Sequence, residues 1–173
     1  MVQHVIHGFG PVWDSSSTVL VLGSMPSPVS REQGFYYMHP RNRFWPVMAA
    51  VFSDDPGASV REREAFALRH HMALWDVLAS CDIDGANDSS IRNPHPNDIG
   101  VILRSAPIRV VVTTGTKAGQ LYRSLIEPGL RRQGIATSMM TLASTSPANA
   151  SKSLEDLIAI YHDAFTQAGV LTE

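Results

Sequence analysis

Short runs of β-branched and apolar residues alternate along the chain with segments whose apolar positions recur at helical spacing. The clearest runs are residues 18–22 and 108–113, and a glycine follows each of them within two residues. Near-continuous apolar runs of this kind are typical of strands in parallel sheets that are covered on both faces. Two weaker strands are predicted at residues 73–78 and 137–142.

Helical spacing is predicted in five segments that lie between and after these strands. The clearest is the last, where Ser153 is placed as the N-cap and Leu154, Leu157, Ile158, Tyr161 and Phe165 form one apolar face. The predicted helices are residues 43–52, 60–70, 97–105, 117–126 and 153–168. Strands that alternate with helices indicate an α/β fold, a three-layer sandwich with a central, mostly parallel sheet.

Loops at one edge of the predicted sheet are the first candidates for a binding site. Sheets of this type bind ligands in the crevice beyond the carboxyl ends of their strands. The loops that follow predicted strands are residues 23–30, 114–116 and 144–147. Residues 54–57 and 127–129 contain Pro and Gly and are predicted to be turns within the same domain.

Composition narrows the class of protein. A chain of 173 residues, 44% hydrophobic and 17% charged, is predicted to form one domain over residues 1–173. A net charge of −2 argues against a protein that coats DNA through many phosphate contacts. The single cysteine, Cys81, excludes an internal disulfide and any cysteine-rich metal site, and it suits a reducing compartment.

The same features set expectations about location and cofactors. The sequence has no apolar stretch of roughly 20 residues, the length that a membrane span needs, and no signal-peptide pattern near Met1. The seven histidines lack metal-ligand spacing. We therefore expect a cytoplasmic monomer that does not bind a membrane and uses no metal and no cofactor.

Candidate chemistry is densest in residues 34–45, where five aromatic side chains are interleaved with one histidine, one asparagine and two arginines. One interpretation is structural, with Phe44 and Trp45 in the core and Asn42 as a helix cap. The other is a pocket for a flipped nucleobase, in which an aromatic ring stacks on the base and an amide reads its polar edge.

Four stretches of the sequence form a recognisable set. They are LGSMPS at 22–27, FYYMHPRN at 35–42, ALWDVL at 73–78 with Ser80 and Cys81, and STSPAN at 144–149. Together they resemble the uracil-DNA glycosylase superfamily. The sequence is similar to the mismatch-specific uracil-DNA glycosylases, without a gap from the first strand through Trp45, and it resembles the hypoxanthine-DNA glycosylase branch more closely.

The resemblance implies a role for each matching position. Asn42 is implied as the main catalytic amide and Tyr37 as the ring that stacks on the extruded base. His39 is a second catalytic candidate, and its alternative role is to fix the turn at Pro40. The other base-binding positions implied are Gly23, Ser24, Met25, Phe35 and Thr114.

The loop after the last predicted strand is implied to hold the DNA. Its hydroxyls and amide groups would contact the phosphate backbone, while Ala148 and Asn149 stand where relatives insert a wedge into the vacated stack. An ordinary Ser/Thr turn is the alternative. The DNA-binding positions implied are Ser27, Ser144, Thr145, Ser146, Pro147, Ala148 and Asn149.

Two departures from the superfamily pattern affect the expected substrate. Met25 occupies the position where the superfamily usually has an Asn or Asp that activates water, which favours the hypoxanthine branch over classical uracil glycosylases. Thr114 precedes Gly115 where that branch commonly has Asn, so base preference stays open. Asp76 is a candidate to orient another group of the site.

These observations predict a monofunctional DNA glycosylase that acts on DNA containing a deaminated base. The N-glycosidic bond of hypoxanthine, and in second place of uracil or xanthine, would break before water adds, and no lysine in these stretches offers a Schiff base. The alternatives are a mismatch-specific uracil/thymine-DNA glycosylase and a non-catalytic module that binds nucleobases or nucleic acid.

Overall fold

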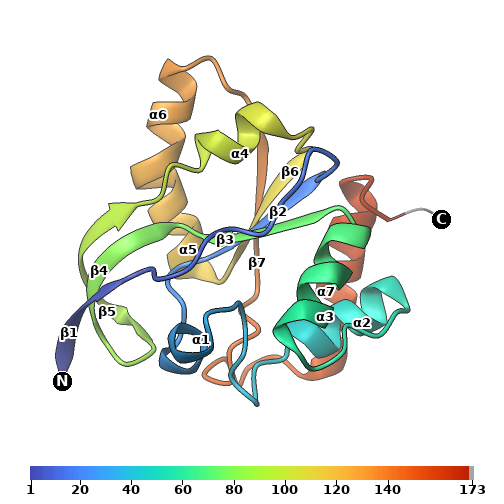
Figure 1. Cartoon of the computed structure of the whole chain (residues 1–173), viewed down its shortest axis with the longest axis horizontal. Coiled ribbons are helices and arrows are strands. Elements are labelled where there is room, and N and C mark those ends of the chain that lie inside the picture. Colours follow the sequence, from blue (N-terminus) through green and yellow to red (C-terminus); the bar gives the residue numbers. More distant parts are fainter. Residues whose placement is uncertain (172–173) are drawn as a thin grey trace.

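Four parallel strands form the central sheet of the computed structural model, which describes residues 1–171 (Figure 1). Their order is β3-β2-β6-β7, and all neighbouring pairs are parallel. The strands are β2 (Val19–Gly23), β3 (Met72–Asp76), β6 (Val110–Thr114) and β7 (Ser138–Leu142). Every residue of β2 and β6 is buried, including Thr113 and Thr114, which end the apolar run of β6.

Helices cover both faces of this sheet. Val19 and Val21 of β2 face a core with α2 (Phe44–Phe52), α3 (Val60–Arg69) and α7 (Leu154–Gln167). Leu20 and Leu22 face a second core with α4 (Gly100–Ser105), α5 (Thr116–Leu121) and α6 (Glu127–Arg132). Figure 1 shows the two groups of helices on opposite sides of the strands. The predicted three-layer α/β fold is confirmed.

A second sheet, which the sequence analysis did not predict, packs at one end of the molecule. It is antiparallel, with the order β1-β4-β5, and consists of β1 (Val2–Ile6), β4 (Leu78–Asp84) and β5 (Asn87–Pro96). The pairing of β4 with β5 contains three register shifts, and most side chains of β5 are at least partly exposed. Such strands carry no regular apolar pattern, so periodicity could not find them.

The helices around α5 also differ from the prediction. Helix α5 runs on into a five-residue π-helix, η1 (Tyr122–Ile126), and then into α6. The turn predicted at residues 127–129 is therefore wrong, because a proline in the first turn of a helix is well tolerated. The helix predicted from residue 97 begins at Gly100, and a short unpredicted helix, α1 (Pro28–Gln33), follows β2.

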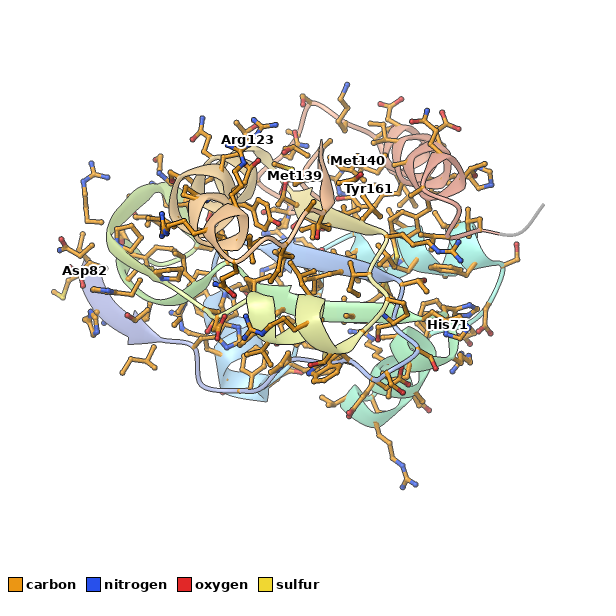
Figure 2. All side chains as sticks on the ribbon, turned by 90° about the horizontal axis from the view of Figure 1, so that it is seen from above. His71, Asp82, Arg123, Met139, Met140 and Tyr161 are labelled. Carbon is orange, nitrogen blue, oxygen red and sulfur yellow. The ribbon has the colours of Figure 1, made fainter. Side chains whose placement is uncertain are left out.

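The predicted start of the last helix is confirmed. Ser153 accepts a hydrogen bond from the backbone of Asp156, whose side chain accepts one from Ser153 in return. Tyr161 lies on the inner side of α7, close to Met140 of β7 in Figure 2, and donates to the backbone oxygen of Ala143 at 2.8 Å. Helix α7 thus anchors the loop that leaves β7.

One expectation about α7 differs from the structure, and another extends past the described residues. Leu154, placed on the apolar face of α7, is 36% exposed. The last two residues of the predicted domain, 172 and 173, lie outside the described residues. Within residues 1–171, no helix combines the length and the apolar character needed to cross a membrane.

Candidate functional site

A pocket lies at the carboxyl ends of all four parallel strands. It opens where the chain leaves β2 and β6 in opposite directions, the place where sheets of this type bind ligands. The residues that line it are Gly23, Ser24, Met25, Pro26, Ser27, Ser30, Tyr36, Tyr37, Asn42, Asp76, Ala86, Asp88, Thr114, Ser144, Thr145 and Ser146.

Gly23, the last residue of β2, keeps the floor of this pocket open. A Cβ atom at this position would lie 2.6 Å from Oδ1 of Asp76, 3.5 Å from the Tyr37 hydroxyl and 3.6 Å from Oγ1 of Thr114. A methyl group does not fit at the first of these distances. The glycine therefore allows three side-chain oxygens from three different segments to converge beside β2.

One oxygen of the Asp76 carboxylate is held by a hydrogen bond with a buried histidine side chain. Asp76 is the last residue of β3 and pairs with Gly23 in the sheet. Its Oδ2 accepts a hydrogen bond from Nε2 of His7 at 2.8 Å, and the two side chains are 5% and 2% exposed. With one oxygen fixed in this way, Oδ1 faces Gly23 and the pocket.

The ring of Tyr37 forms one wall. It stacks on Phe44 with centroids 3.9 Å apart and planes 18° apart, and its hydroxyl lies 3.3 Å from Oγ1 of Thr114. Its backbone has φ 55°, a left-handed conformation that is costly for a bulky residue and that clusters at functional sites. Burial, and next the charge of Asp76, raise the pKa of Tyr37 well above its usual value, so the phenol remains a donor.

Asn42 lines the pocket, and the carbonyl half of its amide is engaged within the protein. Its Oδ1 accepts hydrogen bonds from the backbone N–H of Phe44 and from the hydroxyl of Thr145, each at 2.9 Å. A backbone N–H can only donate, so this oxygen is identified by chemistry and the Nδ2 amino group is the polar atom left for a ligand. The structural interpretation, with Asn42 as the helix cap, is wrong by one position, because Arg43 is the N-cap of α2 and has no side-chain cap hydrogen bond. Asn42 precedes the cap, and its carbonyl oxygen accepts from the first residue of the helix.

Arg43 ties the loop after β7 to the start of α2. Its backbone N–H donates to Thr145, and its guanidinium donates to the backbone oxygens of Ser146, Asn149 and Lys152. A guanidinium that donates to several carbonyls at once holds a loop in one shape. Arg43 thus fixes residues 145–152 from the inside.

Comparison with known proteins places this architecture in a family. The model of the uracil DNA glycosylase superfamily matches residues 9–165, which is most of the chain. The chain belongs to the uracil DNA glycosylase superfamily. It is therefore a DNA glycosylase, an enzyme that releases a base from DNA by cleaving the N-glycosidic bond.

Named relatives lie within this superfamily. A hypoxanthine DNA glycosylase of Methanosarcina barkeri is 32% identical over 160 residues, covering 91% of this chain and 96% of its own. A protein of the same name from Methanosarcina acetivorans is 31% identical over 150 residues, covering 86% and 92%. A solution structure from M. acetivorans, described as a candidate uracil DNA glycosylase, has a TM-score of 0.74 at 28% identity and covers 94% of this chain and 98% of its own.

Most positions that the superfamily resemblance implied do meet in the pocket. Base-binding candidates from three segments and the catalytic candidate Asn42 line it together. The predicted residues in its lining are Gly23, Ser24, Met25, Ser27, Tyr37, Asn42, Thr114, Ser144, Thr145 and Ser146. Those outside the lining are Phe35, His39, Pro147, Ala148 and Asn149.

Two of the residues outside the lining have structural contacts of their own. Phe35, predicted to touch the base, is 4% exposed and stacks on Trp45 in the core, with Tyr36 lining the pocket instead. His39, a catalytic candidate, accepts a hydrogen bond from the backbone of Arg41 on Nδ1 and from Asn42 on its backbone oxygen. Its contacts correspond to the alternative role, a residue that fixes the turn before Asn42.

Several hydroxyls predicted to bind DNA are engaged within the protein. Thr145 is 1% exposed and donates to Asn42, so it positions the amide rather than a phosphate. Ser27 caps α1 by accepting a hydrogen bond from Ser30. Asn149, a wedge candidate, donates to Ser144, whereas Pro147 and Ala148 are exposed at the tip of the loop.

Sequence reasoning missed His7, which follows β1 in a segment with no recognisable pattern. It gave no role to Asp88, which lies in the polar strand β5. Asp76, the last residue of β3, was a candidate only through the superfamily resemblance. Met25, 8% exposed, adds an apolar wall. Within the described part of the chain, no group of three His, Cys, Asp or Glu residues could hold a metal ion.

Proposed function

We propose that this protein is a monofunctional DNA-deoxyinosine glycosylase, which hydrolyses the N-glycosidic bond of hypoxanthine in DNA as a step of base excision repair. Two relatives that bear the name hypoxanthine DNA glycosylase, at 32% and 31% identity, support this choice. The observation that carries it is the Asn42 amide in the pocket lining, whose carbonyl oxygen accepts from two donors, which leaves its amino group for a ligand.

The pocket suits the leaving-group chemistry of such an enzyme. When the glycosidic bond breaks, the electron pair passes to the base, and a hydrogen bond from Nδ2 of Asn42 to the departing base stabilises this negative charge. Asn42 is fixed before the substrate arrives, so little reorganisation is needed in the transition state. Within residues 1–171, the pocket lining contains no lysine for a Schiff base, which fits hydrolysis rather than strand cleavage.

The Asp76 carboxylate supports a preference for deaminated bases. Deamination of adenine converts the acceptor N1 of its ring into an N–H donor, and deamination of cytosine does the same at N3. An ionised carboxylate only accepts hydrogen bonds, and Oδ1 of Asp76 faces the pocket floor. It would pair with hypoxanthine, xanthine or uracil and repel the lone pair of adenine or cytosine.

A direct assay tests the proposal. The protein is incubated in excess with duplexes that contain deoxyinosine, uracil opposite guanine, or deoxyxanthosine, and alkali then converts abasic sites into strand breaks. We expect the fastest breakage with deoxyinosine. Breakage chiefly with uracil would identify a mismatch-specific uracil glycosylase, and tight binding without abasic sites would identify a non-catalytic module.

We also propose the compartment, the oligomeric state and the cofactor requirement of this activity. We infer that the enzyme acts as a cytoplasmic monomer on damaged DNA, without metal or cofactor. The free, buried thiol of Cys81 suits a reducing compartment. Sedimentation of the free protein and of its complex with one duplex tests the monomer.

Substitution of Tyr37 by alanine should weaken capture of the everted base. Stacking of a base on an aromatic ring contributes about 1–3 kcal/mol, so the dissociation constant should rise by roughly 5- to 150-fold. The measurement uses a duplex with 2′-fluoro-deoxyinosine, which resists cleavage because fluorine destabilises the sugar cation. Tyr37→Phe is the matched control, since it keeps the ring and loses only the contact with Thr114. Equal affinities for all three proteins would remove Tyr37 from the base pocket.

A further inference from the structure

Hydrolysis of a nucleoside requires a water molecule held near C1′ of the sugar, and residues 24–27 after β2 offer no carboxylate or amide side chain for this task. Met25 has only a thioether in the position where the superfamily usually has Asn or Asp, and its side chain is buried in the apolar core beside the pocket. The inference that follows rests on the proposed glycosylase function. It concerns the side chain that binds the attacking water in place of the Asn or Asp that is absent at position 25.

Asp88 comes from a different part of the chain and lies in the pocket lining next to the loop that contains Met25. It is the second residue of β5, in the antiparallel sheet, and it lines the pocket. Its Oδ1 accepts a hydrogen bond from the hydroxyl of Ser24 at 2.8 Å. Ser24 immediately precedes Met25, so this contact places the carboxylate next to the loop from which the usual water-binding group is missing.

The contact also orients the carboxylate. Ser24 occupies Oδ1, so Oδ2 is the oxygen that can accept a hydrogen bond from a further molecule in the pocket. The backbone N–H of Leu78 donates to the backbone oxygen of Ser24, and that of Val77 to Gly23, which fixes the loop against the chain between β3 and β4. Ser24, the hydrogen-bond partner of Asp88, is therefore held in place by backbone contacts.

The charges around Asp88 favour a group that can take up a proton. Burial is the main cause that raises the pKa of Asp88 above its usual value, and the negative charge of Asp76 at the end of β3 raises it further. The hydrogen bond from Ser24 and the charge of Lys117 on α5 act in the opposite direction. Cys81 of β4 is the other titratable group that interacts with it. A carboxylate with a raised pKa is a stronger base than an exposed one.

The other carboxylate of the pocket, Asp76, lies where it can contact the base. Asp76 is bound to His7 through one oxygen, and its other oxygen lies beside Gly23 at the floor, between Tyr37 and Thr114. Two carboxylates in one site with different surroundings commonly divide the work between them. Asp76 fits contact with the base, whereas Asp88 of β5 lies against the loop after β2, where Ser24 donates to it.

We propose that Asp88 is a catalytic residue that holds the attacking water and accepts its proton. The bond between C1′ and N9 of the deoxyinosine breaks, and its electron pair leaves with the base. The water oxygen then forms the new bond to C1′, one of its protons passes to Asp88, and the other remains in the hydroxyl of the abasic sugar. Asp88 returns its proton to solvent and the base anion takes one from solvent, so the sum is hydrolysis.

The test compares Asp88→Asn with Asp84→Asn in the full-length protein. Asp84 lies at the end of β4 in the same sheet, but it is exposed and pairs with the amino terminus of the chain. With a deoxyinosine duplex, Asp88→Asn should lower the single-turnover rate by about 10²-fold or more, as expected for a lost general base, while Asp84→Asn stays within threefold of the wild type. Both variants should bind the 2′-fluoro-deoxyinosine duplex as the wild type does.

The pH dependence separates a catalytic role from a structural one. Ionised Asp88 is the active form, so the wild-type rate should fall as pH falls through its raised pKa, and Asp88→Asn should lack this fall. In Asp88→Ala, added azide, which needs no base, should restore cleavage by bonding to C1′.

Three outcomes would overturn the assignment. The first is an Asp88→Asn rate within threefold of the wild type. The second is an Asp88→Asn rate that still falls at low pH as the wild-type rate does. A variant that loses binding of the fluorinated duplex in proportion to its rate would show a structural role instead. A wild-type protein that releases no base at all would remove the proposed function together with this inference, whereas the first three results leave that function in place.

Discussion

Replacing Asn42 with alanine should slow release of hypoxanthine by about 10²–10³-fold, the effect of removing one preorganised donor from a site of developing negative charge. The donor is Nδ2, since Phe44 and Thr145 hold Oδ1. The rate is measured under single-turnover conditions on a deoxyinosine duplex, so that product release does not mask the chemical step. The variant should retain a cooperative unfolding transition.

Asn42→Asp is the matched comparison, because alanine also removes the oxygen that accepts from Phe44 at the start of α2 and from Thr145. Aspartate keeps an oxygen for Phe44 and Thr145, but it offers the departing base a negatively charged oxygen in place of a donor. We expect this variant to fold at least as well as Asn42→Ala and to be no faster. A rate close to that of the wild type in either variant would show that another group stabilises the leaving base.

The central sheet illustrates how far local pattern determines this fold. Apolar residues dominate β2, VLVLG, and the first three positions of β6, VVVTT, and such strands are typical of a sheet that is covered on both faces. The loops at their carboxyl ends then meet without any long-range information. For this reason Gly23, Thr114 and residues 144–146 could be assigned to one pocket from the sequence.

The antiparallel sheet could not be predicted for the opposite reason. The sequence of β5, NDSSIRNPHP, contains turn-forming residues and buries one side chain, Ile91. Its stability comes from pairing with β4, whose partner on the other side is β1, seventy or more residues earlier in the chain. Two polar side chains at or next to the pocket, His7 and Asp88, come from segments adjoining or within this sheet, so no periodic pattern in the sequence placed them there.

The contacts of the site also explain why single-residue roles were harder to predict than the pocket itself. Position in the sequence placed Thr145 and Ser27 near the DNA, but a hydroxyl can serve the backbone or a neighbouring side chain equally well. Here Thr145 orients Asn42 and Ser27 caps α1. Which of these partners a hydroxyl takes depends on loops that the fold brings together, as Arg43 does for residues 145–152.

Replacing Phe44 with alanine should lower the free energy of unfolding by about 3–5 kcal/mol, the usual cost of removing a buried phenyl ring. Phe44 has no exposed surface, meets Trp45 edge-on with centroids 5.0 Å apart, and stacks against Tyr37 at 3.9 Å. The free energy of unfolding of a domain is commonly about 5–15 kcal/mol, so the variant should still be folded below room temperature. Urea-induced unfolding, followed by tryptophan fluorescence, measures the loss.

The same ring connects the core to the base pocket, which Phe44→Leu should reveal. Leucine fills most of the volume, so this variant should lose only about 1–2 kcal/mol of stability, but it cannot provide a flat surface behind the Tyr37 ring. We expect Phe44→Leu to bind the 2′-fluoro-deoxyinosine duplex more weakly than the wild type and more tightly than Tyr37→Ala. If binding were unchanged while stability fell, Phe44 would support the core alone, and the orientation of Tyr37 would have to come from its φ of 55° and its contact with Thr114.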